Sequence, residues 1–122
     1  MKTAKVFSVI LLVLVLSFGL HPKKNSVALA STPLPNNVLV FDSNRTGNYE
    51  IYRMNTSGAN VQLLTYNPSY DSWWPRIAPD RTHIIFYRTP AGVHDTDTTK
   101  NTLWIMNSDG TGQIQLLGVG AY

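Results

Sequence analysis

The sequence predicts an all-β fold of roughly two antiparallel sheets, preceded by an N-terminal signal helix. Three observations predict it. After residue 37, turn-forming residues interrupt the chain about every five to eight positions, which suits short strands. Apolar residues do not recur at the three- and four-residue spacing of a helix. Finally, the stretch "IYRMNTSGANVQLL" has a near copy later in the chain, "LWIMNSDGTGQIQLL", which indicates an internal repeat of one structural unit.

Residues 1–30 have the three parts of a secretory signal peptide. Lys2 and Lys5 precede the apolar run Val6–Leu20, and the segment closes on the small-residue pattern Ala28-Leu29-Ala30. This order predicts an export signal that is cleaved after Ala30. The alternative is an uncleaved membrane anchor, although a membrane-spanning helix needs about 20 apolar residues and His21-Pro22 ends this run sooner.

Removal of the signal changes the charge of the chain. Four of the ten basic residues and none of the seven acidic residues lie in residues 1–30, so the precursor carries +3 and the mature chain about −1. No basic patch remains, and nucleic acid is therefore not an expected partner. We expect a periplasmic or extracellular protein that contacts the membrane only transiently, or stays anchored if the signal is not cleaved. Without cysteine, the exported domain must depend on packing or on neighbours.

The remaining chain divides into four segments. Residues 31–37 contain two prolines and no periodicity, which predicts a linker; residues 38–66 form a first, incomplete unit; residues 67–118 form a second; and residues 119–122 are a tail. Seven strands are expected from β-rich runs between turns: Val38–Phe41, Tyr49–Met54, Val61–Thr65, Trp73–Ile77, His83–Arg88, Thr102–Met106 and Ile114–Leu117.

The two units match position by position. The equivalent pairs are Phe41 and Phe86, Ile51 and Leu103, Tyr52 and Trp104, Met54 and Met106, Asn55 and Asn107, Gly58 and Gly110, and Leu63-Leu64 and Leu116-Leu117. The offset is 45 at the phenylalanines, 52 at the turn and 53 at the last strand, so the insertions fall in loops. A period in the forties with several strands per unit is typical of β-propeller blades.

Both faces of each predicted sheet are largely apolar. Alternate residues of a strand face opposite sides, so Tyr52 and Met54 share one face, and Ile51 and Arg53 share the other. A sheet that is apolar on both sides needs a neighbour on each. The sequence thus predicts a partial β-propeller of about two blades, whose uncovered faces meet a protein partner or a second copy of the chain.

One further stretch carries a resemblance to a known family. "IAPDRTHIIF" resembles the "SPDG" signature of TolB-type, WD-like β-propeller repeats, with Ala78 in place of the serine and Arg81 in place of the glycine. The positions that match the rest of such a repeat are Ser43, Gly47, Asn48, Ile51, Tyr52, Gly58, Leu64 and Thr65. The resemblance implies a propeller of usually six blades. If position 81 needs a positive φ, its side chain costs about 1 kcal/mol.

The sequence offers little for catalysis. It has no Gly-x-Ser-x-Gly motif, no cysteine nucleophile and a single glutamate, Glu50, so we expect no enzyme and no cofactor. Asp95 and Asp97, next to His94, have the Asp-x-Asp spacing with which calcium loops begin. However, no glycine turn or bidentate glutamate follows them, and a solvated loop is the preferred interpretation.

The candidate binding residues are aromatic. Tyr70, Trp73 and Trp74 form either a binding rim for proteins or sugars, or rings that pack between blades. We therefore expect an exported, non-catalytic protein-interaction module. Two alternatives stay open: the chain is a truncated piece of a larger propeller protein, such as a propeller-gated peptidase or lyase, or it binds carbohydrate through Trp73 and Trp74.

Overall fold

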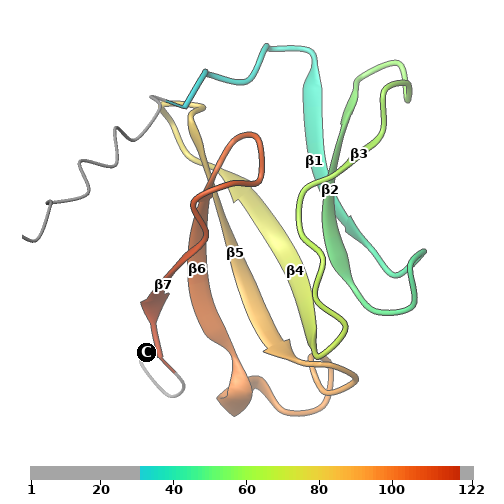
Figure 1. Cartoon of the computed structure of the whole chain (residues 1–122), viewed down its shortest axis with the longest axis vertical. Coiled ribbons are helices and arrows are strands. Elements are labelled where there is room, and N and C mark those ends of the chain that lie inside the picture. Colours follow the sequence, from blue (N-terminus) through green and yellow to red (C-terminus); the bar gives the residue numbers. More distant parts are fainter. Residues whose placement is uncertain (1–30, 119–122) are drawn as a thin grey trace, which may run out of the picture.

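The computed structural model describes residues 31–118, so the predicted signal peptide and the tail lie outside the described residues. Two antiparallel sheets make up this part of the chain (Figure 1). The first contains β1 (Val38–Ser43), β2 (Glu50–Asn55) and β3 (Gln62–Leu63). The second contains β4 (Tyr70–Ile77), β5 (His83–Pro90), β6 (Thr102–Asn107) and β7 (Ile114–Leu117). The predicted all-β fold is confirmed. We call β1–β3 the first blade and β4–β7 the second.

The strand boundaries differ slightly from those expected. β4 begins at Tyr70, three residues early, and β3 is only two residues long. A 3-10 turn, η1 (Thr98–Lys100), was not predicted; the Asp97 carboxylate caps it by accepting from the Thr99 amide. Within residues 31–118, no helix has the length and hydropathy needed to cross a bilayer.

Strand register assigns each side chain to a face, because opposite residues of antiparallel strands point to the same side. In the first blade Phe41 lies opposite Tyr52, and Val40 opposite Arg53. In the second blade Phe86 lies opposite Trp104, and Ile85 opposite Ile105. Each blade thus has an inner face, turned toward the other blade, and an outer face.

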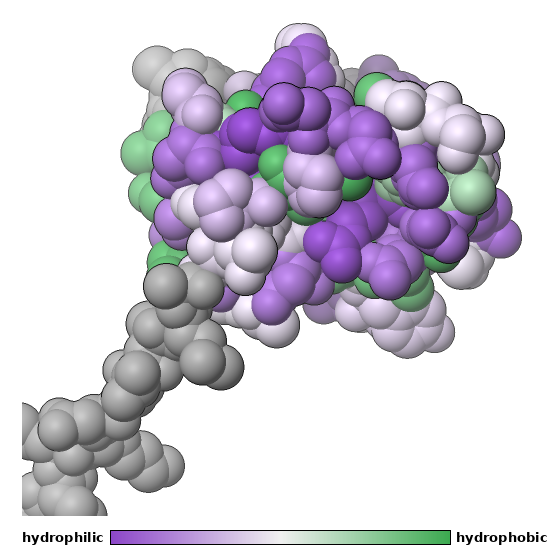
Figure 2. Space-filling view, turned by 90° about the horizontal axis from the view of Figure 1, so that it is seen from above, coloured by the Kyte–Doolittle hydropathy of each residue, from purple (hydrophilic) through white to green (hydrophobic). Residues whose placement is uncertain are grey.

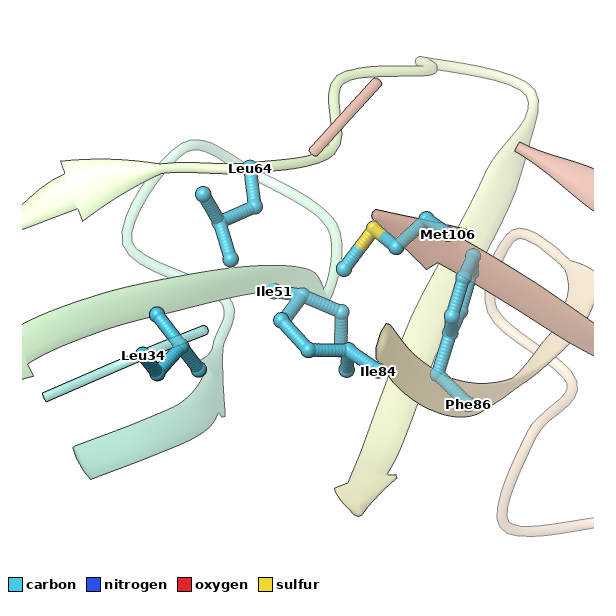
Figure 3. Close-up of a cluster of buried hydrophobic side chains, with 6 residues drawn as sticks. All are labelled: Leu34, Ile51, Leu64, Ile84, Phe86 and Met106. Carbon is cyan, nitrogen blue, oxygen red and sulfur yellow. The ribbon is translucent and has the colours of Figure 1, made fainter. Parts of the chain in front are cut away.

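The hydrophobic core lies between the two inner faces (Figure 3). Ile51 and Leu64 come from the first blade, and Ile84, Phe86 and Met106 from the second. All are buried, and Leu34, from the segment before β1, joins them. The two copies of the repeated unit therefore stack on each other, as the apolar faces predicted.

Polar bonds fix β4 beside the first blade. The Ser72 amide donates to the Tyr49 carbonyl over 2.7 Å, and the Tyr49 amide donates to Asp71 Oδ1 over 2.9 Å. The Trp74 amide reaches Asp42 Oδ1 at 3.1 Å. The register of β4 against β5 shifts between Trp73 and Arg76, where Trp74 takes a positive φ of 52°. This bulge turns the Trp74 ring toward the outer face of the second blade.

The repeated turns adopt the conformation expected of them. Gly58 and Gly110 have φ values of 81° and 91°, and their amides donate to the carbonyls of Asn55 and Asn107. These turns lie at the upper end of the molecule in Figure 1. Seen from that end, the surface is mainly hydrophilic, and hydrophobic residues show at its edges and in gaps near its middle (Figure 2). The turns therefore face solvent, while the apolar surface lies on the sides of the blades.

Residues 31–37, the predicted linker, dock on the folded chain. Leu34 is buried in the core, and its amide donates to the Arg81 carbonyl over 2.8 Å. The Ser31 hydroxyl donates to the Thr82 carbonyl at 2.6 Å, and the Ser108 hydroxyl donates to the Thr32 carbonyl at 2.7 Å. A short segment with one apolar residue has no periodicity to reveal such docking, so only the tertiary structure could place it.

Arg81 has the positive φ that the glycine-containing signature required, at 60°. Its guanidinium compensates by donating to the Leu34 carbonyl over 2.7 Å and to the Pro35 carbonyl. Arg81→Ala keeps the strain and loses these bonds, so it should lower the free energy of unfolding by about 1–2 kcal/mol. Arg81→Gly loses the same bonds but relieves the strain, and it should be about 1 kcal/mol more stable than the alanine variant. Equal urea midpoints for the two variants would contradict this account.

Candidate interaction surfaces

The outer face of the first blade presents apolar side chains to solvent. Leu39 is 45% exposed and Leu63 is 43% exposed. Between them, the rings of Phe41 and Tyr52 stack with centroids 5.6 Å apart. The Arg45 guanidinium lies over both rings, 5.2 Å and 4.7 Å from their centroids, and screens Tyr52 from solvent. Apart from this arginine, the face has the character of a core surface without a neighbour.

The outer face of the second blade is similar. Ile85, Tyr87, Leu103 and Ile105 are each only partly buried, although they stand in central strands. Beside them, the rings of Trp73 and Trp74 stack with centroids 5.9 Å apart, and Trp74 is 52% exposed. The two faces together place most of the exposed large apolar side chains on the sides of the molecule.

The repeat relates these exposed faces to the buried ones. Phe41, Tyr52 and Met54, on the outer face of the first blade, are equivalent to Phe86, Trp104 and Met106, on the inner face of the second. The reverse relation also holds.

Val40, Ile51 and Arg53 lie on the inner face of the first blade and are equivalent to Ile85, Leu103 and Ile105 on the outer face of the second. Each exposed face therefore has the chemistry of a surface that, elsewhere in the same chain, is covered by a blade. The two exposed faces are complementary to each other in the same way as the two buried ones.

The structure separates the predicted aromatic cluster into two places. Trp73 and Trp74 lie together on the outer face, where both also contact Tyr87, at centroid distances of 5.5 Å and 5.9 Å. The Trp73 indole N–H donates to Thr89 Oγ1 over 3.0 Å, which fixes its ring. Tyr70 instead borders a cavity that Arg88 and Trp104 also line. Carbohydrate binding through Trp73 and Trp74 stays a prediction.

In the loop that contains His94, Asp95 and Asp97, these side chains bind to nearby groups of the chain. Asp95 lies 3.1 Å from His94 Nε2, and the other ring nitrogen of His94 lies 3.3 Å from Asp71 Oδ2. Hydrogen bonds from Thr99, led by its side chain, lower the pKa of Asp97 below its usual value. Within residues 31–118, no three histidine, cysteine or acidic side chains come close enough together to hold a metal ion.

Sequence reasoning missed a buried polar group where the chain passes from β3 to β4. Glu50 is completely buried; its carboxylate accepts from the Thr65 hydroxyl at 2.5 Å and from the Asn67 amide at 2.6 Å. These bonds attach the segment after β3 to β2. Arg88, also buried, stands on the inner face of the second blade. The available signal was a charged residue in a strand position among apolar neighbours, Glu50 beside Ile51 and Arg88 beside Tyr87, since an ion is not buried without partners.

Comparison with known proteins agrees with this architecture. No protein-family model matches the sequence. A curated relative, the uncharacterized protein Atu1656 of Agrobacterium fabrum, is 32% identical over 57 residues, which cover 47% of this chain and 19% of that protein.

Among solved structures, a protein of Agrobacterium tumefaciens described as TolB matches with a TM-score of 0.60 and 27% identity. The match covers 67% of this chain and 31% of that one, so the chain spans less than a third of the larger protein. In sequence and in fold, the chain is similar to about two blades of a TolB-like β-propeller.

Proposed function

We propose that the mature chain is an exported, non-catalytic protein-interaction module, and that its outer blade faces stack against blades of a second copy. The export rests on the signal pattern of residues 1–30. The interaction rests on one observation, the equivalence between each exposed blade face and a face that is buried within the same chain. Because each outer face is equivalent to a face that a blade covers, a blade of a second copy is the simplest partner for it.

The repeat also supplies the geometry of the contact. The first blade of one copy would lie on the second blade of the next, with Phe41, Tyr52 and Met54 against Ile85, Leu103 and Ile105. Such a contact joins two different surfaces, so it continues from copy to copy until the ring closes. About three copies would supply the six blades that TolB-type repeats usually form.

Light scattering after size-exclusion chromatography tests the assembly. The purified chain should have a mass that is a multiple of its own and that falls on dilution, because the contact is between separate molecules. A single monomeric species over a roughly hundredfold range of concentration would reject self-assembly.

A pair of glycine variants tests the geometry. Gly110 of the second blade approaches the Leu64 carbonyl of the first, and a Cβ there would lie 2.6 Å from it. Gly58 is the equivalent residue of the first blade and has open space around it, so in the assembly it would approach Leu117 of the neighbouring copy. Gly58→Ala should therefore abolish assembly and cost the single chain only the strain of its φ, about 1–2 kcal/mol.

Gly47→Ala is the matched control. Gly47 also has a positive φ, 114°, and open space around it, and so does Gly92, its equivalent in the second blade. An alanine at position 47 should thus carry similar strain but leave assembly intact. If the two variants assemble equally well, the contact is not built like the one between the chain's own blades.

The alternative, that these faces are covered by further blades of a longer propeller protein such as a propeller-gated peptidase or lyase, is favoured by one observation. The match spans only 31% of the solved TolB-like structure. The coding sequence on either side of these residues decides between the two proposals, since additional repeats of this type in frame would favour the longer protein.

A further inference from the structure

A cavity of about 520 Å³ lies on the inner face of the second blade, where the chain passes from β3 to β4. Arg88, Trp104 and Gln115 line it from the second blade, Lys100 from η1, and Asn67 and Tyr70 from the connecting segment. Its volume is in the range of small-molecule sites. Because its second-blade lining stands on the inner face, with Arg88 and Trp104 on one side of the sheet, the cavity is separate from the outer faces on which the proposed assembly depends.

Arg88 is a buried cation whose direct partners are neutral. It is 7% exposed, its Nη2 donates to Gln113 Oε1 over 2.7 Å, and its Nε lies 3.4 Å from Ser72 Oγ. Among residues 31–118, no carboxylate forms an ion pair with it. Burial lowers the pKa of Arg88, and the more distant Glu50 carboxylate and Tyr70 raise it. A buried guanidinium normally has an anion at hydrogen-bond distance.

Other side chains of the cavity complete the features of an anion site. Lys100, exposed at the end of η1, adds a second positive charge. The Trp104 ring stacks on the Arg88 guanidinium, 4.3 Å from its centroid, and holds the planar group in place. Tyr70, which is 41% exposed, supplies a second aromatic side chain. The Glu50 carboxylate, whose charge acts on Arg88, is already engaged by Thr65 and Asn67.

We propose that this cavity binds a small organic carboxylate that bears an apolar or aromatic group. The carboxylate lies against Arg88, whose planar guanidinium matches its two oxygens, and Lys100 draws it in. The apolar group packs on Trp104 and Tyr70. Gln115 and Asn67 border the cavity and offer additional hydrogen bonds.

The test is an NMR titration of the full mature chain with N-acetylphenylalanine. The Trp104 indole N–H, which donates to Thr102 Oγ1 over 2.8 Å, reports on the cavity wall. Its signal should shift and saturate. The same concentrations of the uncharged amide of this compound should bind at least about tenfold more weakly, because a charge-assisted bond is lost. An equal response to both compounds, or no response to the carboxylate, would overturn the proposal.

Two variants localise the site. Arg88→Gln should weaken binding of N-acetylphenylalanine about tenfold or more, and the exposed Lys100→Glu about three- to tenfold. Arg76→Glu is the matched control: this exposed cation lies on the outer face, 5.3 Å from the Trp74 ring centroid, and its reversal should leave binding unchanged. If Arg88→Gln does not fold, Lys100→Glu and the amide decide. Equal effects of Lys100→Glu and Arg76→Glu would place binding elsewhere.

Discussion

An alanine at position 86 is expected to remove a large part of the free energy of unfolding. Phe86 is 1% exposed and belongs to the core cluster, where it lies beside Met106 (Figure 3). Truncation of a buried phenylalanine costs about 3–5 kcal/mol, because both the transfer of the ring from water and the packing around it are lost. A domain of this size is typically stable by about 5–15 kcal/mol. Urea unfolding followed by circular dichroism measures the loss.

Tyr87→Ala is the matched control for Phe86→Ala. Tyr87 is the next residue of β5, but its ring lies on the outer face and is only partly buried, against Trp73 and Trp74. Its removal should cost about 1–2 kcal/mol, mainly from the lost aromatic contacts. Equal losses for the two variants would mean that the core does not lie between the blades.

Gly110→Ala is expected to be almost as damaging, although it adds a single methyl group. The new Cβ would lie 2.6 Å from the Leu64 carbonyl oxygen and 3.1 Å from the Leu64 Cα, and backbone atoms cannot move aside as a flexible side chain can. The positive φ of 91° adds strain of about 1–2 kcal/mol. Together with the overpacking, the loss should reach about 3 kcal/mol or more.

Gly58→Ala makes this prediction specific to the contact between blades. The turn and the sign of φ are the same at position 58, but nothing lies within 4 Å of the added Cβ. In the monomer, this variant should therefore lose only about 1–2 kcal/mol. Comparable unfolding midpoints for the two variants would show that strain in the turn, and not the approach of Leu64, decides the cost.

Local sequence pattern was enough to predict the strands and the repeat. Alternation and turn residues indicated all seven strands, and the glycines at positions 58 and 110 take the positive φ expected of them. These features depend on near neighbours in the chain, so they can be read from short stretches. The docking of Leu34 and the bulge at Trp74 depend on distant residues, and no short stretch of the chain indicates either.

The candidate surfaces were only partly predictable. The apolar character of both sheet faces follows from alternation, but which face is inner and which is outer depends on the order in which the blades stack. The aromatic cluster was expected as one group, whereas Tyr70 lies in the cavity with Arg88 and Trp73 lies on the outer face. Residues three positions apart in a regular strand face opposite sides, so the separation follows once β4 is known to begin at Tyr70 and not at Trp73.

The amino-acid sequence by itself determined that this protein is all-β, is built from a repeated blade unit and has sheets that are apolar on both sides. These properties are set by side-chain chemistry and by the two-residue period of a strand. Only the tertiary structure decided that Arg88 is buried beside Trp104 and that Gly110 meets Leu64, because both arise where segments distant in the chain are brought together. Burial and close approach depend on that stacking, and no local pattern encodes them.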